Sequence, residues 1–189
     1  MGDINQKLFL TRTLPSVGGP VLEVGSRDYG STENFREVYA GNEYVGVDLC
    51  AGKNVDRLAD LAAGTGGLPE AHFALIICCS VLEHVRRPWE MAENLMRLLR
   101  PAGAMYIAVP WVWRYHPYPD DYYRFSWRGI AELFPRLAWT RQAYSTNVAD
   151  EFFDVGAGVD DNLAKYANTA AGQRKYLPYL QLHMLGVKS

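Results

Sequence analysis

The run Phe73-Ala-Leu-Ile-Ile-Cys-Cys79 limits, more than any other segment, how this chain can fold. It is apolar at every position, whereas a strand with one face in water would alternate apolar and polar residues. Continuous apolarity indicates a strand that is covered on both faces, which is typical of a parallel sheet between two layers of helices. The sequence therefore predicts an α/β protein built on a central sheet.

The segments around this run alternate between strand-like and helix-like patterns. Strands are expected at 20–25, 44–49, 105–109, 137–144 and 179–187, the last as a hairpin partner of 137–144, with 55–61 an ambiguous further strand. Helices are expected at 33–39, 88–100 and 126–134. Strands and helices that alternate at this spacing favour βαβ units, so the sheet should be mostly parallel.

Length and composition indicate a single globular domain over residues 1–189. Hydrophobic residues make up 49% and charged residues 21%, which is enough to bury a core and is unlike a disordered chain. The net charge of −2 disfavours a dedicated nucleic-acid binder. Two segments interrupt the rhythm: a loop at about 110–127, and an insertion at about 146–177 with a helical piece near 161–170.

Several features favour a cytoplasmic protein without a membrane span. Cys78 and Cys79 are adjacent in an apolar run, which suits buried thiols in a reducing compartment. The first residues lack the layout of a signal peptide, and the longest apolar run is far short of the ~20 residues of a membrane helix. There is no CxxC pair, and the spacing of His116 to Asp120 and Asp121 is not a known ligand pattern, so no metal is expected.

Three features converge on the edge of the sheet where ligands of open α/β folds bind. A turn with Gly25 follows the first strand, and glycine lets the backbone approach a ligand closely. Asp48 ends the second strand and can accept hydrogen bonds from ribose hydroxyls, and Asp60-Leu61 lie at the end of the next strand-like segment. Each feature alone also fits a plain turn or a helix cap. Together they predict a site for a nucleoside-containing cofactor.

The order of these segments also resembles a known family. VLEVGSRDYGS, YVGVDL, DRLADL, ALIICCSVLEHV and LLRPAGAMYIAVP, within about 20–135, are similar to the class I S-adenosylmethionine (SAM)-dependent methyltransferases, and QLHMLGVKS resembles their antiparallel last strand. The resemblance implies a Rossmann-like three-layer sandwich with a mostly parallel seven-stranded sheet. It also implies that SAM is the cofactor.

The resemblance places the methionine part of SAM near Glu23 and Gly25, the ribose near Asp48 and the adenine near Asp60 and Leu61. The full set of cofactor residues that it implies is Glu23, Gly25, Ser26, Arg27, Asp48, Leu49, Asp60, Leu61, Ser80 and His84. One departure is the turn Gly25-Ser-Arg-Asp-Tyr-Gly30, which replaces the usual GxGxG and leaves a non-catalytic binding module open. The missing GxGxxG disfavours an NAD(P)-dependent oxidoreductase, which stays the third alternative.

The segment from Trp111 to Trp127 should form an ordered loop over the same edge, because its prolines oppose regular structure. It resembles the HxxPxDYxRxT-like segment of several methyltransferases. His116 is the candidate general base, since imidazole exchanges protons near neutrality, and Asp121 would orient it. The predicted substrate-binding residues are Trp111, Tyr122, Tyr123 and Arg124. Structural roles for His116 and Arg124 are equally open, and Glu83 could be a capping charge.

The sequence thus predicts methyl transfer from SAM to a small-molecule or glycan acceptor, with oxygen as the favoured acceptor atom. Positioning the acceptor, excluding water and accepting a proton are the tasks of the protein in such a displacement. The insertion fits either a lid or a dimer contact, so a homodimer is a further open prediction.

Overall fold

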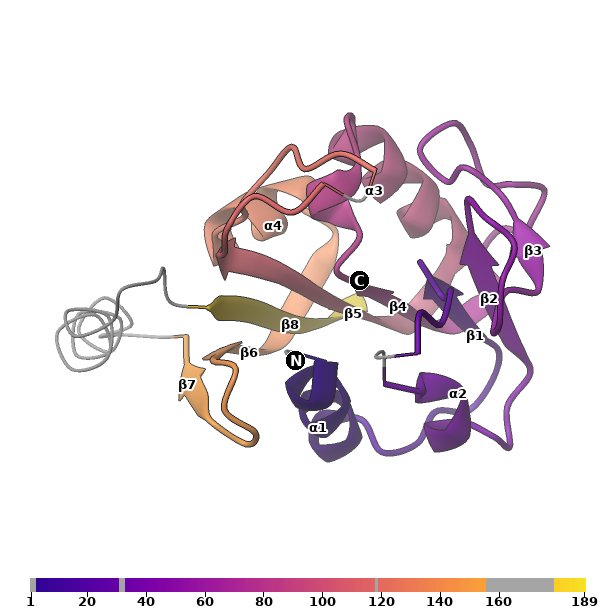
Figure 1. Cartoon of the computed structure of the whole chain (residues 1–189). Helices are drawn as coiled ribbons and strands as arrows, with labels where there is room; N and C mark the ends of the chain where they lie inside the picture. The colour runs from indigo at the N-terminus through magenta and orange to yellow at the C-terminus, as the bar shows by residue number, and fades with distance from the viewer. Residues whose placement is uncertain (1–2, 31–32, 118, 156–178) are drawn as a thin grey trace, which may run out of the picture.

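A computed structural model describes residues 3–30, 33–117, 119–155 and 179–189 of the chain (Figure 1). An eight-stranded sheet runs through the molecule in the order β3-β2-β1-β4-β5-β8-β6-β7. The strands are β1 (Val21–Val24), β2 (Tyr44–Asp48), β3 (Arg57–Leu58), β4 (Phe73–Cys79), β5 (Leu99–Val112), β6 (Leu137–Ser145), β7 (Phe152–Asp154) and β8 (Leu180–Lys188).

Pairing within the sheet confirms the predicted direction of the strands. The first five strands pair in parallel, and β8 lies antiparallel between β5 and β6. The prediction of seven strands was wrong by one, because β7 pairs antiparallel with β6 at the edge of the sheet. β7 has only three residues and falls within the expected insertion at 146–177, so its pattern is too short to predict a strand.

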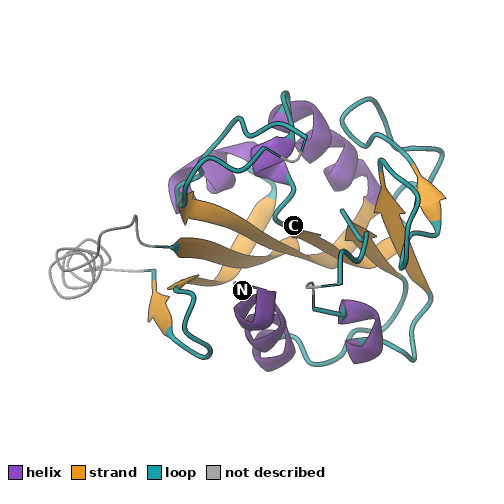
Figure 2. Cartoon of the chain, viewed as in Figure 1, coloured by secondary structure: helices purple, strands orange, loops and turns teal. Residues whose placement is uncertain are grey.

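Helices cover both faces of the sheet, as Figure 2 shows. α3 (Pro88–Leu98) and α4 (Trp127–Leu133) lie on one face, and α1 (Asp3–Thr13) and α2 (Phe35–Val38) lie on the other. A short 3-10 helix, η1 (Leu82–His84), follows β4. Helix α3 begins at Pro88, which suits a first turn where no backbone N–H is needed. The three-layer α/β arrangement agrees with the prediction.

Helix α1 was not predicted, and the reason lies in its buried face. Phe9 and Leu10 are buried, but so are Asn5 and Gln6. Because polar residues share the buried side, the apolar periodicity that marks an amphipathic helix is weak here. Asn5 is satisfied by donating to the backbone oxygens of Thr146 and Val148, both at 2.9 Å. Helix α2 is shorter than its predicted range of 33–39.

Side chains of the central strands alternate between two apolar cores, one on each face of the sheet. Ile76 and Cys78 of β4 belong to the core under α3 and α4, whereas Leu75 and Ile77 belong to the core against α1 and α2. This explains why the run 73–79 has no polar position. In β1 the same alternation turns Glu23 away from the α3 side, since Leu22 and Val24 both occupy that core.

Within the described ranges, no helix combines the length and apolarity that crossing a membrane would require. The predicted helical piece at 161–170 lies outside the described residues, as does most of the expected insertion at 146–177.

Candidate functional site

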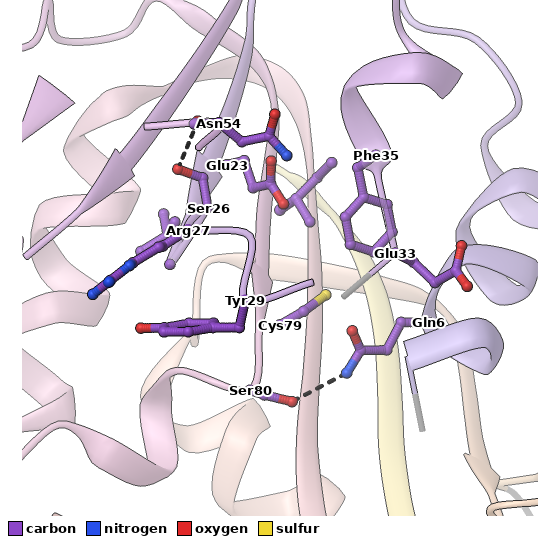
Figure 3. A pocket seen from close by; sticks show the side chains of 13 residues that line it. Gln6, Glu23, Ser26, Arg27, Tyr29, Glu33, Phe35, Asn54, Cys79 and Ser80 are labelled. Carbon is purple, nitrogen blue, oxygen red and sulfur yellow. Dashed lines mark hydrogen bonds between the residues drawn. The ribbon is translucent and has the colours of Figure 1, made fainter. Parts of the chain in front are cut away.

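The carboxyl ends of β1 and β4 border a cavity of about 200 Å³ (Figure 3). Its lining includes five of the residues predicted to hold the cofactor, namely Glu23, Gly25, Ser26, Arg27 and Ser80. It also includes Gln6, Tyr29, Phe35, Asn54 and Cys79, which sequence reasoning missed. Tyr29 and Cys79 lie close in sequence to residues that were predicted to bind the cofactor. Gln6 comes from helix α1, which was not predicted, and no sequence pattern indicated that it would reach the cavity.

The turn after β1 is built for close approach. Gly25 has a φ of +72°, and a Cβ atom there would lie 2.4 Å from Cγ2 of Val81. The amide groups of Gly25 and Ser26 both donate to the Val47 carbonyl oxygen, at 2.8 and 3.1 Å. Only glycine combines this backbone conformation with so little space. The turn therefore packs tightly against the segment that follows β4.

Glu23 supplies an acidic group to the wall of the cavity. Its Oε2 atom accepts a hydrogen bond of 2.8 Å from the Tyr44 hydroxyl group. Burial raises the pKa of the Glu23 carboxyl group to about 7, and the hydrogen bond from Tyr44 opposes that rise. Near neutral pH the Glu23 carboxyl group can thus gain or lose its proton, and a cationic ligand in the cavity would favour the ionised form.

Asp48 and Leu49 lie beside the cavity rather than in its lining. Asp48 accepts hydrogen bonds from the backbone amides of Cys50 at 2.9 Å and Arg27 at 3.4 Å. Leu49 is 62% exposed, so its side chain is available to a ligand. The Arg27 guanidinium lies over the ring of Tyr29, 4.9 Å from its centroid. The strand-end carboxylate is therefore joined directly to the turn after β1.

The structure places Asp60 and Leu61 away from the cavity lining. Asp60 accepts from the amide of Ala62 at 2.9 Å, which is a local turn contact. Leu61 is only 1% exposed and packs in the core, while its carbonyl oxygen accepts from Asn94 at 2.9 Å. A ligand at this edge could meet Leu61 only through its backbone.

Ser80 lines the cavity and forms hydrogen bonds with three of the elements around it. It has a φ of +54°, and its amide donates to Ala108 of β5 at 2.8 Å. Its Oγ atom accepts from the side-chain amides of Gln6 at 3.1 Å and Gln181 at 3.3 Å, the former drawn in Figure 3. Helix α1, β4 and β8 thus meet at this one hydroxyl group.

A second polar group forms in the loop after β5. Asp121, whose side chain is only 1% exposed, accepts from the amide of His116 at 2.8 Å and lies 3.1 Å from its Nδ1 atom. Arg124 pairs with both oxygens of the same carboxylate. This arginine holds the pKa of Asp121 well below its usual range. Asp121 is therefore an anion that holds the His116 backbone and lies beside its ring, whose Nδ1 atom is also 3.1 Å from the Arg114 carbonyl oxygen.

Arg124 uses its donors within the loop. Besides Asp121, it donates to the carbonyl oxygens of Trp113 at 3.2 Å, Arg114 at 2.8 Å and Tyr123 at 2.7 Å. These bonds favour the structural role that the sequence had left open. The predicted substrate-binding role of Arg124 stays a prediction.

The aromatic residues predicted to bind substrate lie in different surroundings. Tyr122 is 44% exposed and donates to Asp120 at 3.0 Å, whereas the Tyr123 hydroxyl donates to the Arg86 carbonyl oxygen at 3.1 Å. Trp111 is partly buried, with its ring centroid 6.5 Å from that of Tyr144. Tyr122 is thus the most open of the three.

His84 lies with this loop. Its Nδ1 atom donates to the Asp120 carbonyl oxygen at 2.6 Å, and its ring stands perpendicular to that of His116 with centroids 4.9 Å apart. Burial lowers the pKa of His84. The neighbouring Glu83 is fully buried, unlike the capping charge considered from sequence, and burial raises its pKa to about 8. Backbone amides of Tyr122 and Tyr123 donate to the Glu83 carbonyl oxygen, at 2.8 and 3.2 Å, which ties the loop to η1.

Known proteins resemble this chain in sequence and in fold. A family model described as a methyltransferase domain matches residues 4–144. The chain belongs to this methyltransferase family. An uncharacterised methyltransferase of Mycobacterium leprae (strain TN) is 32% identical to the domain over 108 residues, which cover 52% of this chain. The match covers 39% of that relative, so it spans well under half of the relative's length.

Two solved structures resemble the methyltransferase domain over nearly all of its length. A SAM-dependent methyltransferase from Archaeoglobus fulgidus has a TM-score of 0.58 and 15% identity, covering 97% of this chain and 94% of that one. The 1,6-didemethyltoxoflavin-N1-methyltransferase of Burkholderia thailandensis has a TM-score of 0.62 and 17% identity, covering 97% and 76%. At these identities the likeness concerns the fold, and it agrees with the predicted Rossmann-like sandwich.

Proposed function

We propose that this methyltransferase domain binds SAM at the carboxyl ends of β1 and β2 and transfers a methyl group to a hydroxyl oxygen of a small-molecule acceptor. The observation that carries the proposal is the cavity bordered by Glu23, Gly25 and Ser80, with the imidazole pair of His84 and His116 on the segments that follow β4 and β5. The Burkholderia thailandensis structure contains S-adenosylhomocysteine (SAH) and its small-molecule acceptor, which supports this class of ligand.

The residues around the cavity fit such a cofactor. Gly25 leaves space where any other residue would place a Cβ atom, so the backbone can approach a ligand. Glu23 offers an acidic group to a cation, and Asp48 offers a carboxylate whose backbone contacts leave lone pairs for ribose hydroxyls. When bound, SAM supplies an electrophilic methyl group. The chain's own part is to orient the two reactants and exclude water.

The loop after β5 and η1 supply groups for the acceptor. The Nδ1 atoms of His84 and His116 face Asp120 and Asp121, so the Nε2 atoms of both rings remain for a ligand. An imidazole nitrogen in this position can accept the proton that a hydroxyl group loses on methylation. His116 as the general base and Asp121 as its positioning residue thus continue as proposals. A glycan acceptor and a homodimer, also expected from sequence, find no support in the described residues or the relatives.

Thermal unfolding with added ligands tests the cofactor. SAM or SAH at about 100 times its dissociation constant should stabilise the protein by ~2.7 kcal/mol, a rise of roughly 5–10 °C, while NAD should have no effect. Asp48→Ala should lose the shift with SAM, and Asp154→Ala, which removes an exposed carboxylate at the far edge of the sheet, serves as the control. If neither SAM nor SAH shifts the midpoint, the altered turn between Gly25 and Gly30 has lost the site and the binding-module alternative replaces this proposal.

Turnover tests the acceptor side. Release of SAH is measured with a panel of hydroxylated small molecules, each compared with its analogue that lacks the hydroxyl group. His116→Ala should lower turnover by at least a hundredfold while keeping the thermal shift with SAM. Equal turnover in wild type and variant would make His116 structural. Methylation of only nitrogen-containing acceptors would refute the assignment to oxygen.

A further inference from the structure

Three side chains of metal-ligand type converge between η1 and the loop after β5. Glu83, His84 and His116 each offer one ligand atom, and these atoms all lie within 4.8 Å of one another. Two of them are adjacent in sequence and the third comes from a separate loop, so the fold rather than a local motif brings them together. The loop is tied in place by the backbone bonds from Tyr122 and Tyr123 to Glu83.

Glu83 is the first independent sign that a ligand belongs here. It is 0% exposed, and neither of its carboxyl oxygens has a hydrogen-bond donor on another described residue. Its nearest charged or chargeable neighbour in the cluster is the Nε2 atom of His84, at 3.8 Å. Buried carboxyl groups normally have a hydrogen-bond partner or a cation, so an unpartnered one needs an explanation.

The two imidazole rings are oriented as metal ligands are. The Nδ1 atom of His84 donates to the Asp120 carbonyl oxygen, and the Nδ1 atom of His116 lies 3.1 Å from the Asp121 carboxylate. Metal-binding histidines typically donate their second ring N–H to a carbonyl or carboxylate oxygen in this way. The same His116 nitrogen also lies 3.1 Å from the Arg114 carbonyl oxygen and 3.3 Å from Arg124 Nη2, which donates to Asp121. The Nε2 atom of His84 lies 3.8 Å from a carboxyl oxygen of Glu83, and the three candidate ligand atoms all lie within 4.8 Å of one another.

We propose that Glu83, His84 and His116 bind a divalent metal ion of the zinc type. Two imidazole nitrogens and one carboxylate oxygen suit Zn²⁺ and its transition-metal neighbours better than Mg²⁺ or Ca²⁺, which prefer oxygen ligands. At metal–ligand distances of about 2.0–2.2 Å, tetrahedral ligand atoms lie roughly 3.3–3.6 Å apart. The side chains would need to close by roughly 1 Å, which small rotations about their own bonds can supply.

Three protein ligands leave at least one coordination position open, as in catalytic zinc sites. This part of the inference rests on the proposed function: an acceptor hydroxyl bound at that position would lose its proton more readily. Glu83 is three residues from Ser80, which lines the cofactor cavity. With such a metal bound, His116 would be a ligand rather than the general base, and the acceptor hydroxyl would be activated by its bond to the metal.

Metal titration of the full chain without SAM tests the site. Protein stripped with a chelator is titrated with Zn²⁺ in competition with a chromophoric chelator, and Co²⁺ is added separately to read its visible spectrum. We expect one equivalent of each, with a Co²⁺ spectrum of a four- or five-coordinate ion. Glu83→Gln, His84→Ala and His116→Ala should each weaken binding at least tenfold, whereas His72→Ala, a histidine outside the cluster, should not.

Absence of stoichiometric Zn²⁺ binding would overturn the proposal, as would wild-type affinity in all three variants or equal loss in His72→Ala. If Glu83→Gln fails to fold, His116→Ala still decides, because its partly exposed ring lies in a surface loop. The thermal shift with SAM is measured in parallel, so loss of the metal site and loss of the cofactor site are distinguished. Turnover that survives metal removal would refute the catalytic role of the metal and favour His116 as the base.

Discussion

Replacing Glu23 with glutamine tests whether the cavity wall holds an acid that loses its proton near neutrality. Glu23 accepts a 2.8 Å hydrogen bond from Tyr44, and burial raises the pKa of its carboxyl group to about 7. Glutamine has nearly the same shape and can accept the same hydrogen bond, but it does not titrate. The substitution therefore removes the proton equilibrium with little change in packing.

The sign of the effect follows from where the proton is bound. The unfolded chain releases the Glu23 proton near pH 4.5, whereas the native protein keeps it until about pH 7. Native stability should consequently fall as pH rises through this window. A pKa difference of about 2.5 corresponds to roughly 3 kcal/mol. Because the cavity admits water to this wall, screening should leave roughly 2 kcal/mol, or about 4–8 °C in the unfolding midpoint.

Urea unfolding of both proteins between pH 4.5 and 8 measures the effect. Glu23→Gln should match wild type at pH 4.5 and exceed it by about 2 kcal/mol at pH 7.5. Parallel curves would refute the reasoning, since they would mean that Glu23 titrates alike in the folded and unfolded states. Calorimetry with SAM adds a second comparison: affinity should rise with pH through 7 in wild type and stay flat in the variant, because the bound cation favours ionised Glu23.

Two further substitutions test the architecture of the site. Gly25→Ala should destabilise the protein by about 2–4 kcal/mol, because strain at positive φ adds to the clash with Val81. Gly30→Ala is the control, because Gly30 has a φ of +83° but open space around it, and it should destabilise the protein by about 1 kcal/mol. Equal destabilisation by the two substitutions would exclude the clash. His183, whose pKa burial lowers to about 3, stays neutral in the native protein while the unfolded chain takes up a proton below pH 6.5. Wild type should therefore lose up to ~1.4 kcal/mol per pH unit below pH 6.5 relative to His183→Gln, and chemical denaturation that shows no such difference would contradict this.

Sequence patterns predicted the strands and helices whose apolar residues follow a regular spacing. The run 73–79 has apolar side chains on both faces, and it became the central strand with a core on each side. Gly25, which lines the cavity, and the strand-end position of Asp48 could be predicted because a turn at positive φ and a carboxylate at the end of a strand are features of single residues. Of the five predicted cofactor residues that line the cavity, four lie within residues 23–27, and the fifth, Ser80, directly follows the run 73–79.

Other parts of the site depend on contacts between distant segments, which no local pattern records. Gln6 reaches Ser80 only because a helix with a polar buried face packs under the sheet. Leu61 follows a recognisable family pattern, yet its side chain is used by the core. From sequence Glu83 could be a capping charge, and only the loop that closes over η1 shows it to be buried. Burial and pairing of such residues are properties of the tertiary structure.

The position of β8 has a consequence for synthesis of the protein. Of the described strands this one comes last in sequence, but it lies inside the sheet, with β5 on one side and β6 on the other. β6 and β7 are hydrogen-bonded to the rest of the sheet through β8. During translation, the edge of β6 that pairs with β8 therefore stays unpaired until residues 180–188 have left the ribosome. A chain stalled before that point would expose this edge, which could pair with nascent chains on neighbouring ribosomes of the same messenger RNA.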